Sequence, residues 1–422
     1  MKRPKIGARR AANASPPAAV STVPVPPRRD AHATVREGSA KITRMPRQPY
    51  SVPTHGAETA IPETSTEVLI VGAGPIGIEL AAALRREGVH YEQLDAGQLG
   101  STIEWWAPQT RFFSSPERIA IAGVPLATLD QGKATREEYL LYLRSVVAQF
   151  DLPIHSFQRV TGLARRPGGG FTATSEGVGD RRRWHAARVV LAIGDMHGPR
   201  RLGIPGEDLS HVSHYLAEPH RYFRRRVLIV GGKNSAVEAA IRCSRVGAEV
   251  ALSYRGADLD PERVKYWLLP EIRALLRDGR VRWLPLTMPR EIRPGSVLLE
   301  RLPGRGDHAG EGERAAEAAG EPVEVAADEV LLLTGYAQDP DLFEQAGVTL
   351  EGPGRKPRFD EQTMETDVPG LYVAGTAASG TQLGGVRAFI ENTHVHVERI
   401  VAAVTGREPP RAEAPVYELP ES

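Results

Sequence analysis

Two similar segments, whose first glycines lie 159 residues apart, constrain the fold of this chain more than any other feature of its sequence. In the first, an apolar run at 67–71 leads into Gly72-Ala73-Gly74-Pro75-Ile76-Gly77. In the second, a similar run at 226–230 leads into Gly231-Gly232-Lys233-Asn234-Ser235-Ala236. Each segment predicts a strand, a tight turn, a helix of about three turns and a second strand. The sequence therefore predicts an α/β protein with two Rossmann-like dinucleotide-binding domains.

The first fingerprint has the spacing of a dinucleotide-binding turn. Gly72 permits the tight turn, Gly74 lets backbone approach a pyrophosphate, and Gly77 lets the helix lie close to the strand. The start of the helix then offers free N–H groups and the positive end of its dipole to the phosphates. Asp95 follows Gly72 by twenty-three residues, where a carboxylate can accept hydrogen bonds from ribose hydroxyls.

The second fingerprint differs at two places. Lys233 replaces the middle glycine, so either the dinucleotide sits farther away or the lysine ammonium contacts a phosphate; we favour the second interpretation. The position that corresponds to Asp95 is Tyr254, and Arg255 follows it. A carboxylate would repel a ribose 2′-phosphate, whereas an arginine can bind it through two hydrogen bonds. The second domain is therefore predicted to bind NADP(H), with Gly231, Gly232, Asn234 and Ser235 completing the turn.

Two different ribose partners imply two different dinucleotides. Hydride transfer needs a donor and an acceptor, and NADPH with a flavin is the natural pair. The chain has a single cysteine, Cys243, which excludes an internal disulfide, a Cys-x-x-Cys pair and a cysteine zinc cluster. Redox chemistry must therefore use a bound cofactor.

Composition excludes other classes of protein. Lys and Arg number 53 against 52 Asp and Glu, so no basic field for nucleic acid is expected. The longest apolar stretch, near 68–84, is broken by Glu79 and by glycines, so no membrane-spanning segment is expected.

The N-terminal region has its own composition. Residues 1–50 hold eleven Lys or Arg and two Asp or Glu, with much Pro and Ala and no apolar periodicity. We expect a disordered basic tail over 1–65. Whether this tail binds an acidic partner is left open. Arg9-Arg10 is not followed by an apolar region, so a twin-arginine export signal is rejected and a cytoplasmic location is expected. A flexible loop is expected at 304–322 and a second tail at 406–422.

With these features, the chain resembles the two-dinucleotide-binding-domain flavoprotein oxidoreductases, and most closely the thioredoxin-reductase-like bacillithiol-disulfide reductases. The resemblance covers residues 66–405. Its generic parts are the first fingerprint and residues 189–194 and 366–375. The more specific parts are Gln109-Thr110-Arg111-Phe112-Phe113-Ser114-Ser115, the second fingerprint, Lys265-Tyr266-Trp267 and Phe389-Ile390-Glu391-Asn392.

The resemblance implies a discontinuous FAD domain over 66–205 and 329–405, with an NADPH domain inserted at 206–328. In such flavoproteins the segment that ends at Gly375 runs under the flavin. The resemblance, together with the aromatic content of residues 105–115, adds five candidate cofactor-binding residues: Gln109, Phe113, Gly194, Gly375 and Thr376. Residues 105–115 are expected to form a wall of the flavin site because their rings offer flat stacking area.

Three departures from the family pattern bear on the chemistry. The bacillithiol-disulfide reductases that this chain resembles carry a cysteine inside the first fingerprint, where this chain has Ile76. Related flavoproteins often have an aspartate where this chain has Thr376, and thioredoxin reductases have a Cys-x-x-Cys pair that is absent here. Cys243 is expected to be a buried, small apolar residue in a helix.

The chain is predicted to be an NADPH-dependent FAD oxidoreductase without a redox-active cysteine of its own. Its electron acceptor is expected to be a small molecule or a disulfide, and that acceptor can be free or part of a protein. The alternatives are a flavin-dependent monooxygenase and a non-catalytic flavin- or nucleotide-binding regulator. No catalytic base is named, and no metal site is expected. His394 and His396, near the end of an expected helix, point to different faces, which disfavours a shared metal. Whether the chain forms a homo-oligomer is left open.

Overall fold

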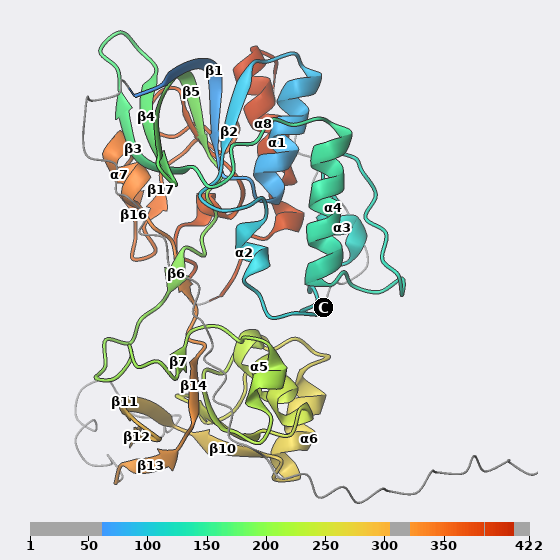
Figure 1. Ribbon diagram of the computed structural model, residues 1–422, viewed down its shortest axis with the longest axis vertical. Coiled ribbons are helices and arrows are strands. Elements are labelled where there is room, and N and C mark those ends of the chain that lie inside the picture. Colours follow the sequence, from blue (N-terminus) through green and yellow to red (C-terminus); the bar gives the residue numbers. More distant parts are fainter. Residues whose placement is uncertain (1–60, 304–320, 384, 409–422) are drawn as a thin grey trace, which may run out of the picture. The chain divides into compact units, whose positions relative to one another are not determined.

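The computed structural model describes residues 61–303, 321–383 and 385–408 (Figure 1). Most of the predicted N-terminal tail, of the loop at 304–322 and of the tail at 406–422 lies outside these ranges. Two corrections concern their edges. Glu63–Ser65, which the sequence assigned to the tail, begin the first strand, where Glu63 is the register partner of Arg183. Gly406, with a φ of 71°, ends the last helix.

The first sheet combines strands from both ends of the described chain. Its strands are, in spatial order, β2 (Tyr91–Leu94), β1 (Glu63–Val71), β5 (Asp180–Leu191), β4 (Phe171–Gly177) and β3 (Arg159–Arg165), with β18 (Leu371–Val373) paired to β5. β1, β2, β5 and β18 run parallel, whereas β4 is antiparallel to β5 and β3 to β4. A segment from near the C-terminus therefore completes a sheet that the N-terminal part begins.

Helices pack around this sheet and bury its apolar residues. Figure 1 shows α1 and α8 side by side next to the sheet, and one large apolar core includes residues of both. The helices are α1 (Pro75–Arg86), α2 (Ser101–Glu104), α3 (Pro116–Ile119), α4 (Arg136–Gln149), α7 (Asp341–Ala346), α8 (His394–Thr405) and the 3₁₀ turns η2 (Gly375–Ser379) and η3 (Ile390–Asn392). A side chain of α7, that of Gln345, accepts a hydrogen bond from the N–H of Leu163 and so pairs with the edge strand β3.

The second sheet is entirely parallel. Its strands are, in order, β10 (Val281–Pro285), β9 (Glu249–Tyr254), β8 (Arg226–Val230), β14 (Glu329–Leu332) and β7 (Val212–Ser213). Helices α5 (Asn234–Arg245) and α6 (Leu269–Arg277) and the turn η1 (Pro219–Tyr222) accompany it. Three further strands form an antiparallel sheet: β11 (Thr287–Arg293), β12 (Ser296–Arg301) and β13 (Val323–Ala326). Two short strand pairs complete the described elements. They are β6 (Gly198–Pro199) with β15 (Tyr336–Ala337), and β16 (Leu350–Glu351) with β17 (Lys356–Pro357).

The two predicted strand–helix–strand units form as expected. α1 and α5 each have 12 residues. After them, Gly88 and Gly247 adopt φ values of 72° and 84°, which side chains other than glycine rarely accept. In both units the strand after the helix pairs in parallel with the strand before it. The same local pattern of glycines and apolar residues thus builds the same unit twice.

The predicted boundary at residue 329 needs a correction. β14 pairs with β8, so Glu329–Leu332 belong to the second sheet rather than to the returning part of the first. The chain leaves the second sheet only after this strand, where β15 pairs with β6. The apolar run of β14 has the pattern of any buried parallel strand, and that pattern does not say which of two parallel sheets receives it.

Candidate functional site

A cavity of about 760 Å³ opens where β1, β5 and β18 end, next to the first glycine turn. The carboxyl ends of parallel strands are the usual place for a nucleotide in an open α/β sheet, and the volume is within the range of ligand pockets. Eight predicted cofactor residues line it: Gly72, Gly74, Pro75, Ile76, Asp95, Gly194, Gly375 and Thr376.

Two positions of the turn, 74 and 77, require glycine for different physical reasons. Gly74 has an ordinary extended backbone, with φ −76° and ψ 179°, and a β-carbon there would meet nothing within 4 Å. Its lack of a side chain therefore leaves open space at the start of α1. A β-carbon on Gly77 would lie 2.2 Å from the carbonyl oxygen of Gly72, so this glycine lets the helix lie against the turn. The first glycine leaves room for a ligand, and the second is needed for packing.

Asp95 is buried, and it ties the turn to the segment after β2. One carboxylate oxygen accepts a hydrogen bond from the N–H of Ala73 at 2.6 Å. The other accepts hydrogen bonds from the N–H of Gly97 at 2.8 Å and from the hydroxyl of Ser101 at 3.3 Å. The sequence predicted a contact with ribose; the structure adds a role in holding the turn in place, and Asp95 still borders the cavity.

The C-terminal part of the chain supplies the opposite wall. The hydroxyl of Thr376 borders the cavity and has no hydrogen-bond partner among the described residues, so it is available to a ligand. The N–H of Gly375 donates a hydrogen bond to Nδ1 of His396 at 3.2 Å. Burial, helped by Arg399, lowers the pKa of His396 to about 4, so this ring is neutral at pH 7 and carries its proton on Nε2.

The aromatic side chains of residues 105–115 lie in three different environments. Trp105 and Trp106 border the cavity, as expected of a flavin wall. Phe112 is buried against Tyr139, with ring centroids 4.4 Å apart, and belongs to the core. Phe113 contacts Trp267 at 5.9 Å and is not among the residues that line the cavity.

Gln109 is exposed and also lies outside the lining. Its N–H donates a hydrogen bond to the carboxylate of Glu137, and its φ is 61°. The roles of Gln109 and Phe113 in cofactor binding therefore stay predictions.

The cavity also has polar lining residues that the sequence did not single out. Asp195 and His197 follow the predicted Gly194, and Asp339 and Arg159 border the same space. Nδ1 of His197 accepts a hydrogen bond from the N–H of Asp339, and burial lowers the pKa of this histidine. Asp195 and His197 could have been found from the sequence, because polar residues soon after a buried strand lie at the ligand-binding edge of such a sheet.

The second glycine turn has a different surface. A β-carbon on Gly232 would lie 2.3 Å from the ring of Tyr254, so this ring lies directly on the turn. Lys233 is exposed and caps α5 with an extended backbone at φ −113°. Asn234 uses its side-chain oxygen to accept a hydrogen bond from the N–H of Lys265.

Cations gather at the start of α5. Partial burial and the guanidinium groups of Arg263, Arg200 and Arg255 lower the pKa of Lys233. Arg263 is paired with Asp260 at 3.0 Å, but Arg200 and Arg255 have no carboxylate partner in the described part of the chain. Arg200 comes from the connection after β6, outside the repeated unit, which is why the sequence comparison of the two units missed it.

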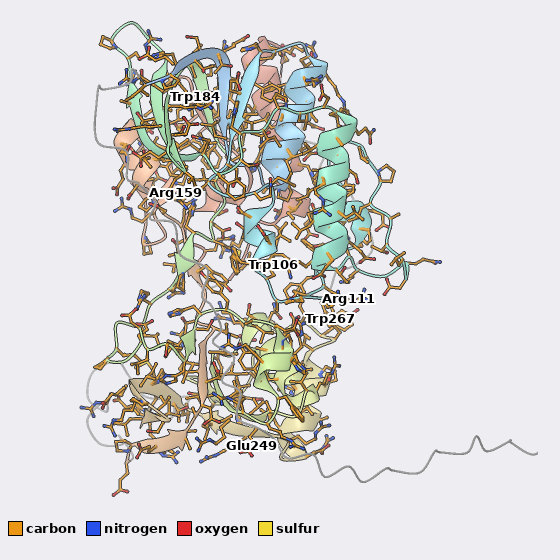
Figure 2. All side chains as sticks on the ribbon, in the orientation of Figure 1. Trp106, Arg111, Arg159, Trp184, Glu249 and Trp267 are labelled. Atoms are coloured by element: carbon orange, nitrogen blue, oxygen red, sulfur yellow. The ribbon has the colours of Figure 1, made fainter. Side chains whose placement is uncertain are left out.

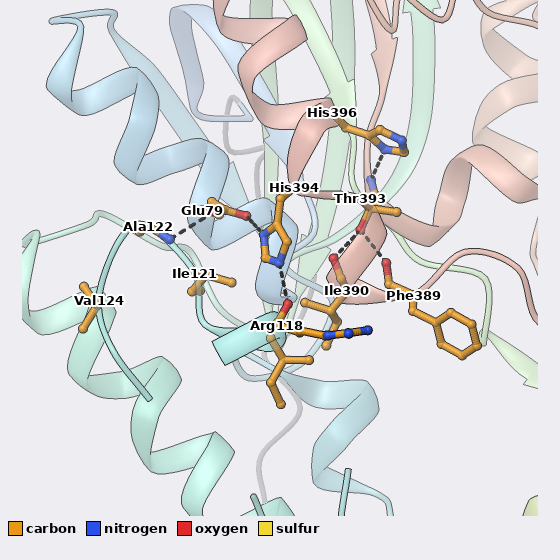
Figure 3. A network of polar contacts seen from close by, with 12 residues as sticks. Glu79, Arg118, Ile121, Ala122, Val124, Phe389, Ile390, Thr393, His394 and His396 are labelled. Atoms are coloured by element: carbon orange, nitrogen blue, oxygen red, sulfur yellow. Dashed lines mark hydrogen bonds and ion pairs between the residues drawn. The ribbon is translucent and has the colours of Figure 1, made fainter. Parts of the chain in front are cut away.

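A polar network joins α1, α3 and α8 close to the cavity (Figure 3). Nδ1 of His394 lies 2.7 Å from a carboxylate oxygen of Glu79, and Nε2 lies 2.9 Å from the carbonyl oxygen of Arg118. Both partners are acceptors, so both ring nitrogens donate only when the imidazole is protonated. Burial alone would lower the pKa of His394, but Glu79 and the Arg118 carbonyl raise it.

This network corrects the predicted position of the two histidines. α8 begins at His394 rather than ending there, because residues 390–392 form a separate 3₁₀ turn. The hydroxyl of Thr393, the residue between the two, bonds back to the carbonyl of Phe389. Thr393 and Ile390 both border the cavity, so the network fixes a segment of its wall.

Over the described ranges, no three His, Cys, Asp or Glu side chains are placed so that they could hold a metal ion. No helix in the same ranges has both the length and the apolar character needed to cross a membrane.

Comparison with known proteins gives the family. Residues 69–375 match the model of the pyridine nucleotide-disulphide oxidoreductases. The bacilliredoxin reductase Bdr of Bacillus subtilis is 31% identical over 81% of this chain and 98% of its own length. The solved bacillithiol disulfide reductase Bdr of Bacillus cereus is 30% identical, has a TM-score of 0.73, and matches 82% of this chain and 100% of its own.

A flavin-containing monooxygenase from Stenotrophomonas maltophilia shares the fold at 22% identity, with a TM-score of 0.61 over 81% of this chain and 98% of its own. That likeness extends to the fold alone. The residues of the cavity fit FAD, because Gly74 leaves room beside the helix start and Thr376 offers a hydroxyl that has no hydrogen-bond partner among the described residues. The chain belongs to the pyridine nucleotide-disulphide oxidoreductase family, and it is an NAD(P)H-dependent flavin oxidoreductase with FAD and NADP(H) as its cofactors.

Proposed function

We propose that this enzyme oxidises NADPH and reduces a disulfide that reaches the flavin directly, with no cysteine of the enzyme between them. The observation that carries the proposal is the place of Ile76, which borders the cavity and has an apolar side chain where a relay thiol would be needed. The single cysteine, Cys243, is fully buried in α5, and burial raises its pKa to about 12. A thiol with such a pKa is a poor nucleophile at neutral pH.

In this proposal the net reaction consumes NADPH, a proton and a disulfide and yields NADP⁺ and two thiols. FAD, when bound, supplies the carrier that accepts a hydride from NADPH and delivers two electrons to the disulfide. The chain positions this carrier. The start of α1 beside Gly74 would hold the pyrophosphate, Asp95 keeps the turn in shape, and the hydroxyl of Thr376 would donate a hydrogen bond to FAD.

The start of α5 is proposed to select NADPH. Arg255 and Arg200 are free of carboxylates among the described residues, and the charge of each lowers the pKa of Lys233. We assign the 2′-phosphate to Arg255, with Arg200 in support, and the pyrophosphate to Lys233. A bidentate arginine contact with a phosphate commonly contributes about 1.5–3 kcal/mol.

Anaerobic kinetics test the proposal. The flavin of the purified enzyme is first reduced with one equivalent of NADPH, and 2-hydroxyethyl disulfide is then added. We expect flavin reoxidation with thiol release, and the same rate in the variant Cys243→Ala. A loss of disulfide reduction in that variant would restore a role for the enzyme thiol. Reduction by NADPH with no reoxidation by any disulfide, but with hydroxylation of an added amine in air, would favour the monooxygenase instead.

Three further expectations stay predictions. A cytoplasmic location fits an enzyme that consumes NADPH, which is supplied there. The basic residues 1–50 fit an acidic partner, and sedimentation of the full chain tests association with a second copy.

A further inference from the structure

Residues 337–339 lie where the chain comes back from the second sheet, and they contact two segments that are distant from them in sequence. The N–H of His197, a residue of the segment after β5, donates a hydrogen bond to the carbonyl of Ala337 at 3.1 Å. The N–H of Gln338 donates one to the hydroxyl of Thr381, just after η2, at 3.0 Å. The returning chain is therefore bonded to the segments that follow β5 and η2.

The side chain of Gln338 joins the same two parts of the chain through a single group. Its Nε2 donates one hydrogen bond to the carbonyl of Gly194 at 3.0 Å and another to the carbonyl of Ala377 at 2.9 Å. Gly194 follows β5, and Ala377 belongs to η2. An amide NH₂ group has two hydrogens to donate, so both are used. This one amide thus links the first half of the domain to its C-terminal half.

The surroundings of this amide fix its orientation. The residue is only 8% exposed, and both of its neighbours are carbonyl oxygens, which accept hydrogen bonds and cannot donate them. An amide turned the other way would place its own oxygen against these two acceptors. In the observed orientation Oε1 is buried and has no hydrogen-bond partner among the described residues. A buried, unpaired acceptor is unfavourable, so the favourable polar contribution of this side chain comes from its NH₂ group.

The two segments that this amide joins form walls of the cofactor cavity. Gly194 borders the cavity after β5, and Gly375 and Thr376 border it at the start of η2. A β-carbon on Gly194 would lie 3.8 Å from the hydroxyl oxygen of Thr376, so the two walls lie close together. Figure 2 labels Trp106 and Arg159, two other residues that border the same cavity. A group that bonds to both walls helps to set the distance between them.

We propose that Gln338 is a positioning residue for FAD, whose NH₂ group holds the walls at Gly194 and Thr376 at the separation that the cofactor requires. Gln338 is not among the residues that line the cavity, so it acts through the two carbonyls that it bonds. Without these hydrogen bonds, η2 would be less firmly tied to the end of β5, and the hydroxyl of Thr376 would lose its fixed place. The inference concerns how the flavin is held, and it does not depend on the acceptor that the flavin reduces.

Two variants of nearly the same size separate positioning from a general loss of stability. Gln338→Met keeps the length of the side chain and removes both donors. Gln338→Glu places a carboxylate against the two carbonyls, and this group regains one donor when it is protonated. Tyr142→Phe is the control, because Tyr142 is also buried, also donates a hydrogen bond to a backbone carbonyl, that of Val124 at 2.6 Å, and does not line the cavity.

FAD release is measured on the loaded enzyme by the rise of flavin fluorescence on dilution, at several pH values from acidic to alkaline, and each variant is compared with the parent at the same pH. We expect Gln338→Met to weaken FAD roughly tenfold or more at every pH, because two hydrogen bonds are lost. Gln338→Glu should be weakest at alkaline pH and should approach the parent as the pH falls and its carboxylate is protonated. Tyr142→Phe should lower the thermal midpoint and keep the parental affinity for FAD.

Three results would overturn the positioning role. The first is parental affinity for FAD in Gln338→Met. The second is a ratio between Gln338→Glu and the parent that does not change with pH, and this result decides alone where Gln338→Met does not fold. The third is a loss of FAD affinity in Tyr142→Phe as large as in Gln338→Met, because FAD binding would then follow the general stability of the domain. Since FAD release is the readout, a failure of the proposed disulfide chemistry would leave this test unaffected.

Discussion

Replacing Gly74 with valine should remove FAD without unfolding the protein. The backbone at Gly74 is extended, which valine accepts, and a β-carbon there meets nothing within 4 Å. Valine is a poor N-cap, at a cost of up to about 1 kcal/mol, but a glycine replacement also restricts the unfolded chain by about 0.4–1 kcal/mol. The free energy of unfolding of the apoprotein should therefore change by less than about 1 kcal/mol.

Cofactor affinity should change far more. The added side chain would occupy the space in which the pyrophosphate approaches the start of α1. Losing two hydrogen bonds to a charged group costs about 3–6 kcal/mol, or roughly a hundredfold to ten-thousandfold in affinity. Flavin content after purification and titration of the apoprotein with FAD measure this loss. Denaturant unfolding of both apoproteins measures stability.

Two glycines provide the controls. Gly168→Val places the same side chain in equally open space, in the turn between β3 and β4 and away from the cavity, and should leave flavin content unchanged. Gly77→Ala should do the reverse of Gly74→Val. Its β-carbon would lie 2.2 Å from backbone, so it should destabilise the apoprotein by about 1–3 kcal/mol or more. Parental FAD affinity in Gly74→Val would refute the assignment of the turn.

The other expectations concern the nucleotide and a histidine. Arg255→Ala should weaken NADPH about tenfold or more and leave NADH nearly unchanged, because only NADPH carries the 2′-phosphate; equal losses in stopped-flow titrations would contradict the assignment. Lys233→Ala should weaken both nucleotides, since both share the pyrophosphate, and an unchanged NADH affinity would contradict that contact. Because the pKa of His394 is raised in the folded protein, its stabilising contribution is fully present below its unfolded pKa of about 6.5 and is lost as the pH rises through the folded value. Unfolding of His394→Gln followed against pH should show a destabilisation that is largest at acidic pH and shrinks as the pH rises; a constant difference would mean that the ring is not charged in the native state.

The sequence predicted the parts of the fold that local rules decide. Gly88 and Gly247 end their helices with positive φ, a requirement that is visible from their position after an apolar period. Partner choice between distant segments was less visible. β14 has the pattern of any buried parallel strand, so only the folded chain shows that Glu329 starts a strand of the second sheet.

The candidate site shows the same division. The spacing of Gly72, Gly74 and Asp95 predicts their place at a dinucleotide site, and the structure places these three at one cavity. Trp106 and Phe112 belong to one aromatic segment and their ring centroids lie 5.0 Å apart, yet Trp106 borders the cavity whereas Phe112 is buried in the core. Composition alone could not separate them. Arg200 was missed because it joins the start of α5 from a different part of the chain.

We expect the two fingerprints to hold their dinucleotides in different ways. Both helices begin with an extended N-cap residue, and the two units differ there mainly in what the N-cap residue carries. Gly74 borders a cavity of about 760 Å³ that also has the buried carboxylate of Asp95 in its wall. Lys233 at the corresponding N-cap is exposed, so a contact that it makes with a phosphate would be open to solvent and salt. A nucleotide held mainly by such charges dissociates more readily as ionic strength rises, whereas one enclosed beside Gly74 does not. We therefore propose that the residue at the N-cap, Gly74 or Lys233, contributes to a resident flavin and a transient NADPH on the same repeated fold.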